Sequence, residues 1–462
     1  MSIKSKYIGD SQFYKKTLSV AVPIMIQNGI TNFVGLLDNI MVGRVGTEQM
    51  SGIAIVNQLL IVFNLAIFGA ISGAGIFTAQ YYGAGDDEGV RNTFRFKMYI
   101  CIGITALGIL ALSFFGENLI RLYLHGEGNG LSVEDALIYG KKYLRIMLIG
   151  MIPFAIEQSY SGTLRECGET SVSMKAGIAA VAVNLGLNYV LIFGKFGFPA
   201  LGVEGAAIAT VISRYVQAAI VIIWTHTNKE KMPFIKGAYR KPAVPAALTK
   251  QIVMRGAPLM LNEVLWAAGI AALNQCYSMR GLDAVAAINI SSTITNLFNV
   301  VFIAFGDAIA IVVGQLLGAE RYDEAKDTDR KLITFSVLLC VGIGALLALL
   351  APLFPKLYKT NDGVRQLAGQ VMRISAAFMP AYAFMHAAYF TLRSGGKTIV
   401  TFLFDSVFLW VISVPVAFVI SRYTGVPLLL LFFSIQALDL IKCAVGFVLV
   451  KKGVWINKIV RT

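Results

Sequence analysis

The amino-acid sequence predicts an all-α membrane protein of about twelve transmembrane helices, arranged as two pseudo-symmetric six-helix lobes with a central cleft between them. Three observations support this fold class: an apolar composition, long apolar runs along the whole chain, and a second half that repeats the first. Hydrophobic residues make up 56% of the 462 residues and charged residues 14%, with a mean hydropathy of +0.69. Soluble domains carry about 25% charged residues, so this composition is typical of a chain built for lipid.

Apolar runs longer than about 18 residues recur, and each is long enough to cross a hydrocarbon core of about 30 Å. The runs are too continuous for barrel strands, which would alternate apolar and polar residues. Helices satisfy their backbone groups internally and are therefore expected. The predicted spans are roughly 17–42, 50–78, 94–116, 142–164, 172–194, 202–225, 250–277, 284–314, 332–353, 370–392, 399–420 and 427–450.

The chain repeats itself. When the sequence from Pro258 is placed under the sequence from Pro23 without a gap, "QYYGA" at 80–84 meets "QLLGA" at 315–319. A second match, at a slightly different offset, pairs "GTLRECGETSVS" with "FTLRSGGKTIVT". An even number of spans in each half predicts parallel halves related by an axis along the membrane normal, as in many secondary transporters. The expected domains are an N-terminal lobe over 1–228, a cytoplasmic linker over 229–249 and a C-terminal lobe over 250–462.

The net charge of +14 could suggest a nucleic-acid partner, but the basic residues flank the spans. Their largest cluster lies in the middle connection, "THTNKEKMPFIKGAYRKPAVPAALTK". Because basic loops tend to stay cytoplasmic, both termini and this connection are placed on the cytoplasmic side of the membrane. One loop expected outside is also basic and fits the rule poorly; it contains Arg121, Lys141, Lys142 and Arg145.

Several function classes lack their signatures. The five cysteines and three histidines show no metal-ligand or disulfide spacing, and no phosphate-binding glycine loop is present. No motif suggests a nucleophile with its base. The sequence therefore indicates a secondary transporter rather than an enzyme or an ATP-driven pump.

An acid within the stretch "NFVGLLDNIMVGRVG" is the first candidate for function. A carboxylate near the middle of a membrane costs about 2.5–3.5 kcal/mol on insertion scales, and such groups usually face a bundle interior or a wet cavity. The alternative is that Asp38 pairs with Arg44, but six residues of separation place the two on different helix faces. Asn39 next to Asp38 remains open between a packing role and a functional one.

The motifs together resemble the multidrug and toxic compound extrusion (MATE) family, with NorM-like and DinF-like branches. "PIMIQNGITNFVGLLDNIMVGRVGTEQMSGIAI" resembles its first helix and loop, and "AVNLGLNYVLIFGKFGFPALGVEGAAIATVISR" is similar to its fifth and sixth helices. The exits "TLRECGET" and "TLRSGGKT" look like those of its fourth and tenth helices. The resemblance covers nearly the whole chain. It implies two six-helix lobes in a V shape and the efflux of cationic or amphipathic drugs in exchange for Na⁺ or H⁺.

The resemblance also assigns a coupling site. Asp38 matches the family's acid in the first helix, and Asn184 and Asn188 match two positions of the same site in the fifth helix. The DinF-like branch usually has Asp at the second of these positions, so Asn188 weakens the charge of the site. Asp38 could bind Na⁺ together with the two amide oxygens, or it could carry a proton; no other cofactor is expected.

A second cation site, in the C-terminal lobe of the NorM-like branch, is not supported. Its tenth-helix acid is missing, and His386 lies in that vicinity instead. Glu263 is a few residues closer to the proline than that branch's seventh-helix acid and is not equated with it.

Residues outside the matched motifs remain open as substrate or proton sites. Glu263, with Trp266 beside it, could face a cationic drug, or could instead pair with Arg255 near the entrance. Asp405, which lies in an apolar run, and His386 are further substrate or proton candidates, and Asp307 is a case similar to Asp405. Asp439 and Lys442, three apart on one helix face, are expected to form an internal ion pair.

Pro23 and Pro258 begin corresponding helices of the two halves and are candidate hinges, because proline removes a backbone hydrogen bond and can bend a helix.

The predicted function is a cation-coupled multidrug antiporter, expected to be a monomer that contacts small-molecule drugs or toxins and membrane lipids. One alternative is a flippase for a lipid-linked oligosaccharide or another amphiphile, which would require a basic cleft; the spans carry few basic residues, chiefly Arg214 and Lys442. A lipid-modifying enzyme and a channel are further alternatives.

Overall fold

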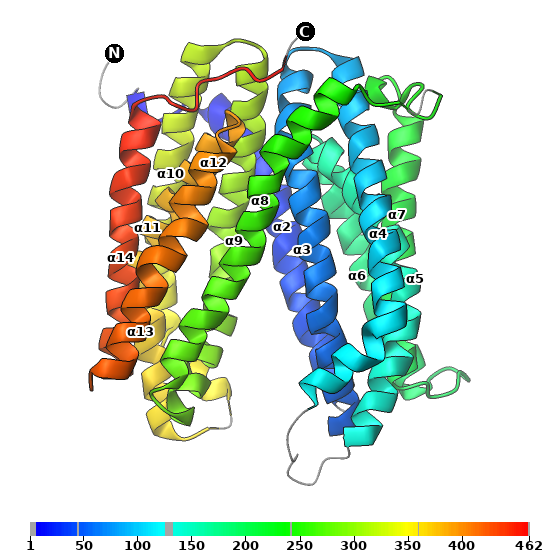
Figure 1. The fold of residues 1–462 in the computed structure, drawn as a ribbon, viewed down its shortest axis with the longest axis vertical. Helices are drawn as coiled ribbons and strands as arrows, with labels where there is room; N and C mark the ends of the chain where they lie inside the picture. The colour runs from blue at the N-terminus through cyan, green and yellow to red at the C-terminus, as the bar shows by residue number, and fades with distance from the viewer. Residues whose placement is uncertain (1–5, 44–45, 125–132, 241–242, 359, 461–462) are drawn as a thin grey trace. The chain divides into compact units, whose positions relative to one another are not determined.

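The computed structural model describes residues 6–43, 46–124, 133–240, 243–358 and 360–460, apart from the side chains of 34–40, 42–43 and 47. Within this part of the chain the regular secondary structure is helical, with no strand (Figure 1). The all-α fold class predicted from the apolar runs is thereby confirmed.

Twelve long helical segments lie at the predicted positions. Nine of the helices in the described residues are long and apolar enough to cross a membrane. The segments are α2 (Ser11–Gly43), α3 (Thr47–Gly83), α4 (Asp87–Tyr123), α5 (Val133–Glu166), α6 (Thr170–Phe193), α7 (Val203–Thr227), α8 (Ala246–Ser278), α9 (Leu282–Gly318), α10 (Tyr322–Leu350), α11 (Asp362–Ser394), the run from α12 (Thr398–Phe402) to α13 (Val414–Tyr423), and α14 (Leu428–Lys451). Two π-helical stretches, Leu403–Val407 and Leu409–Ser413, connect α12 to α13.

Helix lengths and turns reproduce the internal repeat. Both α2 and α8 are 33 residues long, and both α3 and α9 are 37 residues long. The turn after α3 and the turn after α9 have the same pattern of backbone hydrogen bonds. The same position of each turn has a positive φ angle, at Gly85 (φ +72°) in one and at Glu320 (φ +58°) in the other. The duplication read from the sequence is therefore present in the backbone.

The chain divides into two compact units. Unit 1 contains Met1–Met25, Ala79–Asp86 and Val253–Thr462, and unit 2 contains Ile26–Thr78 and Asp87–Ile252. Each is described by itself below. The boundaries 1–228, 229–249 and 250–462 and the central cleft stay predictions.

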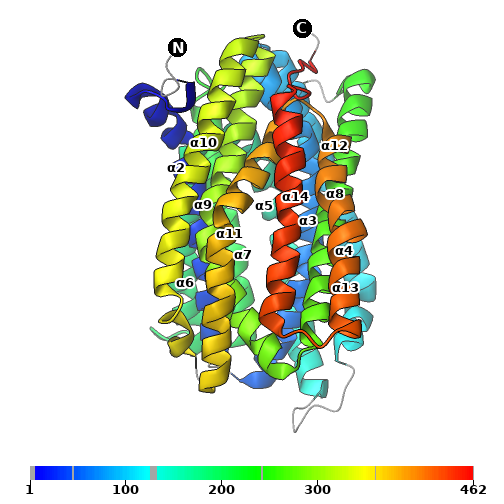
Figure 2. The ribbon, with the colours of Figure 1, turned by 90° about the vertical axis from the view of Figure 1, so that its left-hand side faces the viewer.

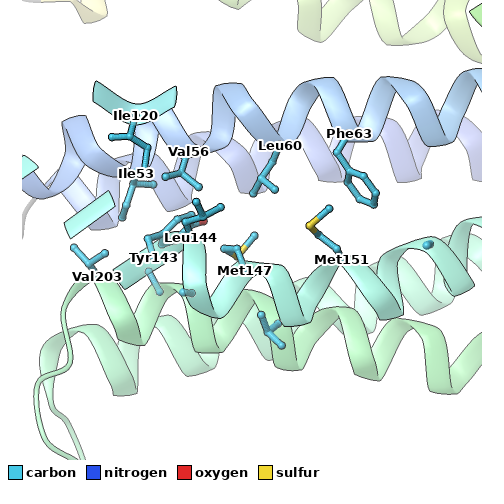
Figure 3. Packing of buried hydrophobic residues seen from close by; sticks show 14 of the residues in the cluster. Ile53, Val56, Leu60, Phe63, Ile120, Tyr143, Leu144, Met147, Met151 and Val203 are labelled. Atoms are coloured by element: carbon cyan, nitrogen blue, oxygen red, sulfur yellow. The ribbon is translucent and has the colours of Figure 1, made fainter. Parts of the chain in front are cut away.

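The core of unit 2 is the interface between α3 and α5, and buried side chains of α4, α6 and α7 pack at its edges (Figure 3). Ile53, Val56, Leu60 and Phe63 follow the three- and four-residue spacing that places side chains on one helix face. They meet Tyr143, Leu144, Met147 and Met151 of α5, with Ile120 and Val203 beside them.

In unit 1, α11 is the central helix, with α9, α10 and α14 packed around it (Figure 2). Its buried side chains include Met372, Met379 and Leu392. The first part of α2 belongs to this unit, because Val20, Ala21 and Ile24 pack against Phe305 of α9.

The ends of α3 and α9 approach each other at two glycines that the repeat aligns. A Cβ built on Gly83 would lie 1.9 Å from the carbonyl oxygen of Gln315, and one built on Gly318 would lie 1.9 Å from that of Gln80. Neither position can accept a larger residue unless the two backbones separate. The contact is reciprocal, as expected where a pseudo-twofold axis passes between two copies of one motif.

Replacing Gly83 with Ala is expected to lower the melting temperature of the purified protein in detergent, because the methyl group meets backbone. The cost should be about 1–3 kcal/mol, the range for overpacking a close contact. Gly342→Ala in α10 is the matched control, since nothing lies within 4 Å of its Cβ position; it should leave stability unchanged or raised by about 0.5–1 kcal/mol. Equal melting temperatures for Gly83→Ala and Gly342→Ala would contradict the reciprocal contact.

Candidate functional site

The predicted coupling acid lies on α2, in the part of that helix that belongs to unit 2. The backbone of Asp38 and Asn39 is helical, but both side chains lie outside the described residues. Their assigned and alternative roles, pairing of Asp38 with Arg44 included, therefore stay predictions.

The two asparagines assigned to the same site form a buried hydrogen-bonded chain in unit 2. Asn188 Nδ2 donates to Asn184 Oδ1 at 3.1 Å, one helical turn away on α6, and Asn184 Nδ2 donates to Thr210 Oγ1 of α7 at 3.3 Å. The residues are 1% and 5% exposed, respectively. Three polar side chains thus gather three oxygens in an otherwise apolar interior, and hard cations prefer oxygen ligands. Thr210 was not predicted.

No group of three or more His, Cys, Asp or Glu residues suited to a metal ion occurs in the described part of the chain, which lacks the Asp38 side chain.

A second polar network lies in unit 1 and centres on Asn262 of α8. Its Nδ2 donates to Asp405 Oδ2 at 3.2 Å and lies 3.4 Å from the Tyr389 hydroxyl, while Ser406 Oγ donates to its Oδ1 at 2.7 Å. Asn262 is 3% exposed. The network links α8, α11 and the π-helical part of α12–α13, and sequence reasoning missed its central residue because the partners are far apart in the chain.

Lys442 of α14 completes this network and corrects one prediction. Its Nζ lies 2.9 Å from Asp405 Oδ1, with side-chain exposures of 12% and 20%. Among the described residues, this ion pair replaces the expected pair between Lys442 and Asp439 on one face of α14. The expectation failed because it considered neighbours within one helix, and the tertiary partner lies 37 residues away.

The position of Asp405 depends on an irregular helix. Asp405 and Ser406 occupy the π-helical stretch Leu403–Val407, where the wider turn changes which side chains face α8. π-helical stretches are rare in proteins, and those that occur are often found at functional sites. Irregular helical turns of this kind give no clear sequence signal.

Glu263, the neighbour of Asn262, is half-buried on α8. The charged side chains near it are Arg393, Asp405 and Asp307. The alternative partner Arg255 is directed elsewhere and donates to the Gly396 carbonyl at 2.8 Å. Glu263 therefore lies next to the Asn262 network and near Asp307 of α9, and its role as a substrate or proton site stays a prediction.

His386 and Trp266 differ in their surroundings. His386 of α11 packs edge-on against Phe302, with ring centroids 4.8 Å apart, and lies near the charges of Asp405 and Lys442. Trp266 is 45% exposed on α8. The structure thus places His386 beside the network, while the substrate role predicted for Trp266 stays a prediction.

The two prolines lie inside helices rather than at their starts. Pro23 comes twelve residues after Ser11, and Pro258 comes twelve residues after Ala246. The predicted spans began at 17 and 250, after the first residues of these helices, "SQFYKK" and "AALT". The division between the compact units crosses α2 between Met25 and Ile26, just after Pro23.

A buried acid of unit 2 was also missed. Glu157 of α5 is 2% exposed and accepts hydrogen bonds from Ser161, from Gln158 at 2.8 Å and from Gln217 at 3.1 Å. The polar letters of "PFAIEQSYSGTLR" within an apolar span could have indicated it. Three donors in place account for its burial structurally.

Comparisons with known proteins agree with this architecture. The MatE family profile matches residues 23–190 and 258–419, one match in each half of the chain. The "Probable multidrug resistance protein NorM" of Thermotoga maritima is 26% identical over 97% of this chain and 94% of its own length. The "Probable multidrug resistance protein YoeA" of Bacillus subtilis is 24% identical over 88% and 87%.

Solved structures show the same fold. A multidrug resistance MATE family transporter in an outward-facing conformation superimposes with a TM-score of 0.86 at 19% identity, covering 98% of this chain and 97% of that one. A mutant of the Vibrio cholerae MATE transporter VcmN gives 0.84 at 19% identity, covering 97% and 98%.

Duplicated six-helix halves with polar groups buried inside apolar helices define a multi-pass membrane transporter, and not an enzyme. The chain belongs to the MatE family, whose profile covers both halves.

The Asp405–Lys442 pair gives a prediction. Lys442→Met should destabilise the protein by about 3–5 kcal/mol, because it leaves a buried carboxylate unpaired. The double variant Asp405→Asn/Lys442→Met should recover most of that loss. Melting temperatures in detergent measure both, and Lys326→Met serves as the control because its pair with Asp323 is exposed. The single variant Asp405→Asn is measured as well. A loss of stability in the double variant equal to the sum of the losses in the two single variants would refute the pairing.

Proposed function

We propose that this chain is a secondary active antiporter that exports cationic or amphipathic drugs in exchange for Na⁺ or H⁺. The observation that carries the proposal is membership of the MatE family over both halves, combined with an acid inside the apolar helix α2. The similar NorM and YoeA proteins are named as multidrug resistance proteins, which supports drugs as the cargo.

The coupling site proposed is Asp38 with Asn184, Asn188 and Thr210. The amide and hydroxyl oxygens of the last three can share in binding a small cation, while Asp38 supplies the compensating negative charge. If H⁺ is the coupling ion, Asp38 carries it and the amides orient the carboxyl group. Ion and drug then favour opposite states of the transporter, and by linkage each weakens the binding of the other.

The network around Asn262 is proposed as the part of unit 1 that responds to a cationic substrate. Glu263 and Asp405 provide negative charge, and Lys442 keeps Asp405 neutralised when no substrate is present. A drug cation that approached Glu263 would compete with Lys442 and Arg393 for the same carboxylates.

The contacts of Arg214 and Lys442, the two basic residues that a flippase would use, argue against the flippase alternative. Arg214 donates to the Gly150 carbonyl at 3.2 Å and stacks over Phe154 with 5.0 Å to the ring centroid, and Lys442 is paired with Asp405. Both side chains are thus engaged within their own units, where they serve packing rather than a basic cleft.

The chain is proposed to reside in the inner (or sole) bacterial membrane as a monomer, with both termini cytoplasmic. The basic loops that support this orientation are those identified from the sequence.

Asp38→Asn is expected to abolish ion-driven efflux, because the substitution removes the charge that exchanges with the cation. Efflux of ethidium from cells under separate Na⁺ and pH gradients measures this and tells which ion drives the wild type. Asp323→Asn, on an exposed side chain of α10, is the control. Undiminished ethidium efflux by Asp38→Asn under both gradients would remove the coupling assignment.

Pro23→Ala is expected to slow transport without lowering protein yield, because restoring the backbone hydrogen bond stiffens α2 near the division between the units. The rate of ethidium efflux per molecule of protein measures the effect, and Pro258→Ala tests the corresponding helix. Wild-type rates for Pro23→Ala would argue against a hinge in α2.

A further inference from the structure

The connection after α7 is held firmly against unit 2 rather than lying free as a linker. Arg95 of α4 donates from Nε to the Ala238 carbonyl at 2.6 Å and from one terminal nitrogen to the Gly237 carbonyl at 2.8 Å. Arg91, one turn earlier, donates to the Phe234 carbonyl at 3.0 Å. Phe234 and Ala238 are buried. Two arginines of α4 thus fix the backbone of residues 234–238 in one conformation.

Aromatic side chains fix the other end of this connection. The Tyr160 hydroxyl lies 3.0 Å from His226 Nε2 and also contacts the Tyr239 hydroxyl. The rings of His226 and Tyr239 are stacked, 10° from parallel with centroids 6.1 Å apart. These two contacts fix the orientation of the His226 ring. A left-handed turn at Gly237 (φ +75°) brings the chain back toward α7.

A cavity of about 370 Å³ lies between the end of α7 and this connection. Its lining residues are His226, Lys229, Ile235, Lys236, Gly237 and Arg240. Three of the six carry a permanent positive charge, a fourth has a ring nitrogen, and Ile235 is an apolar contact. The volume falls in the range of small-molecule sites, which is about 300–1,000 Å³.

The positive charges of the cavity are only partly compensated. Lys236 pairs with Glu230 at 2.7 Å, but the Glu230 side chain is 93% exposed, and such a pair contributes little and is easily exchanged. Within the described residues, no salt bridge involves Lys229 or Arg240. The nearby Lys231 is paired with Glu169 and does not line the cavity. An anionic ligand would therefore meet two or three available cations.

The cavity lies where a membrane span ends, since α7 is apolar enough to span and ends at Thr227. Trp224, in the last turn of α7, has Lys231 over its ring at 5.8 Å. Tryptophan beside lysine at a helix end is typical of the membrane–water interface, where phospholipid phosphates lie.

We propose that this cavity binds the phosphate of an anionic phospholipid headgroup. Lys229, Lys236 and Arg240 contact the phosphate oxygens, with the guanidinium of Arg240 suited to a bidentate contact. Ile235 is buried and forms an apolar part of the cavity wall. Basic pockets at helix ends are suited to such headgroups. The bound lipid would hold the connection against the end of α7. This role does not depend on which ion or drug the protein carries.

The test uses the full-length protein purified in detergent and titrated with a short-chain phosphatidylglycerol, with bound lipid counted by native mass spectrometry. The pocket variant is Lys229→Gln/Lys236→Gln/Arg240→Gln. The matched control is Lys175→Gln/Lys195→Gln/Lys250→Gln, which removes three charges from exposed residues of the same unit that do not line the cavity. Inorganic phosphate and short-chain phosphatidylcholine are titrated in parallel.

The wild type and the control are expected to bind phosphatidylglycerol with similar affinity, and the pocket variant about 100-fold more weakly. Neither phosphatidylcholine nor inorganic phosphate at millimolar concentration should replace the bound lipid. Equal binding by the pocket variant and the control would overturn the proposal. Tight binding of inorganic phosphate alone, at the affinity of the lipid, would overturn the assignment to a lipid.

Melting temperatures without added lipid show that the variants are folded. Because the substituted side chains are exposed, all three proteins should melt together in the absence of lipid, and phosphatidylglycerol should raise the melting temperature of the wild type and the control only. A stabilising effect of the lipid on the pocket variant as large as on the wild type would again refute the site.

Discussion

Ionisable side chains inside apolar helices must find polar partners, because an unpaired charge in a low-dielectric interior is expensive. This constraint organises both compact units. In unit 1 the Lys442 ammonium meets Asp405, and Asn262 and Ser406 complete the hydrogen bonding around it. In unit 2 Glu157 accepts from Ser161, Gln158 and Gln217. The first network fixes how α8, α11, the α12–α13 run and α14 face one another, and the second fixes how α5 faces α7.

The duplicated halves have diverged at these polar positions. Thr163 and Thr391 are aligned by the repeat, and both lie close to a charged residue. In the first half Lys97 donates to Thr163 at 3.2 Å and is paired with Glu166. In the second half Thr391 donates to Asp329 at 2.5 Å. The threonine at this aligned position thus accepts a hydrogen bond from a cation in the first half and donates one to an anion in the second half. The two halves therefore have the same fold but different charges around this position.

The fold could be predicted from the sequence because it depends on local composition and on the repeat. Apolar windows placed all twelve helical segments, and the "QYYGA" and "QLLGA" motifs marked the two reciprocal glycine contacts. The partners within the polar networks could not be predicted in the same way. Asp405 and Lys442 are far apart in sequence, and their meeting depends on a π-helical stretch and on the packing of α14. The docking of residues 234–238 on Arg91 and Arg95 likewise required long-range contacts that a linker composition does not indicate.

The π-helical stretches of α12–α13 have a consequence for how the two copies can differ in length. The run Thr398–Tyr423 has 26 residues, whereas α6, its counterpart in the first half, has 24. A π-helical turn takes up more residues than an α-helical turn, so the surplus residues need not lengthen the helix in proportion. The connection to α14 is short, Thr424–Pro427 by position, while the one after α6 covers Gly194–Gly202. The second half therefore has more residues in this helix and fewer in the loop after it than the first half, and the π-helical turns are where extra residues fit between α-helical turns.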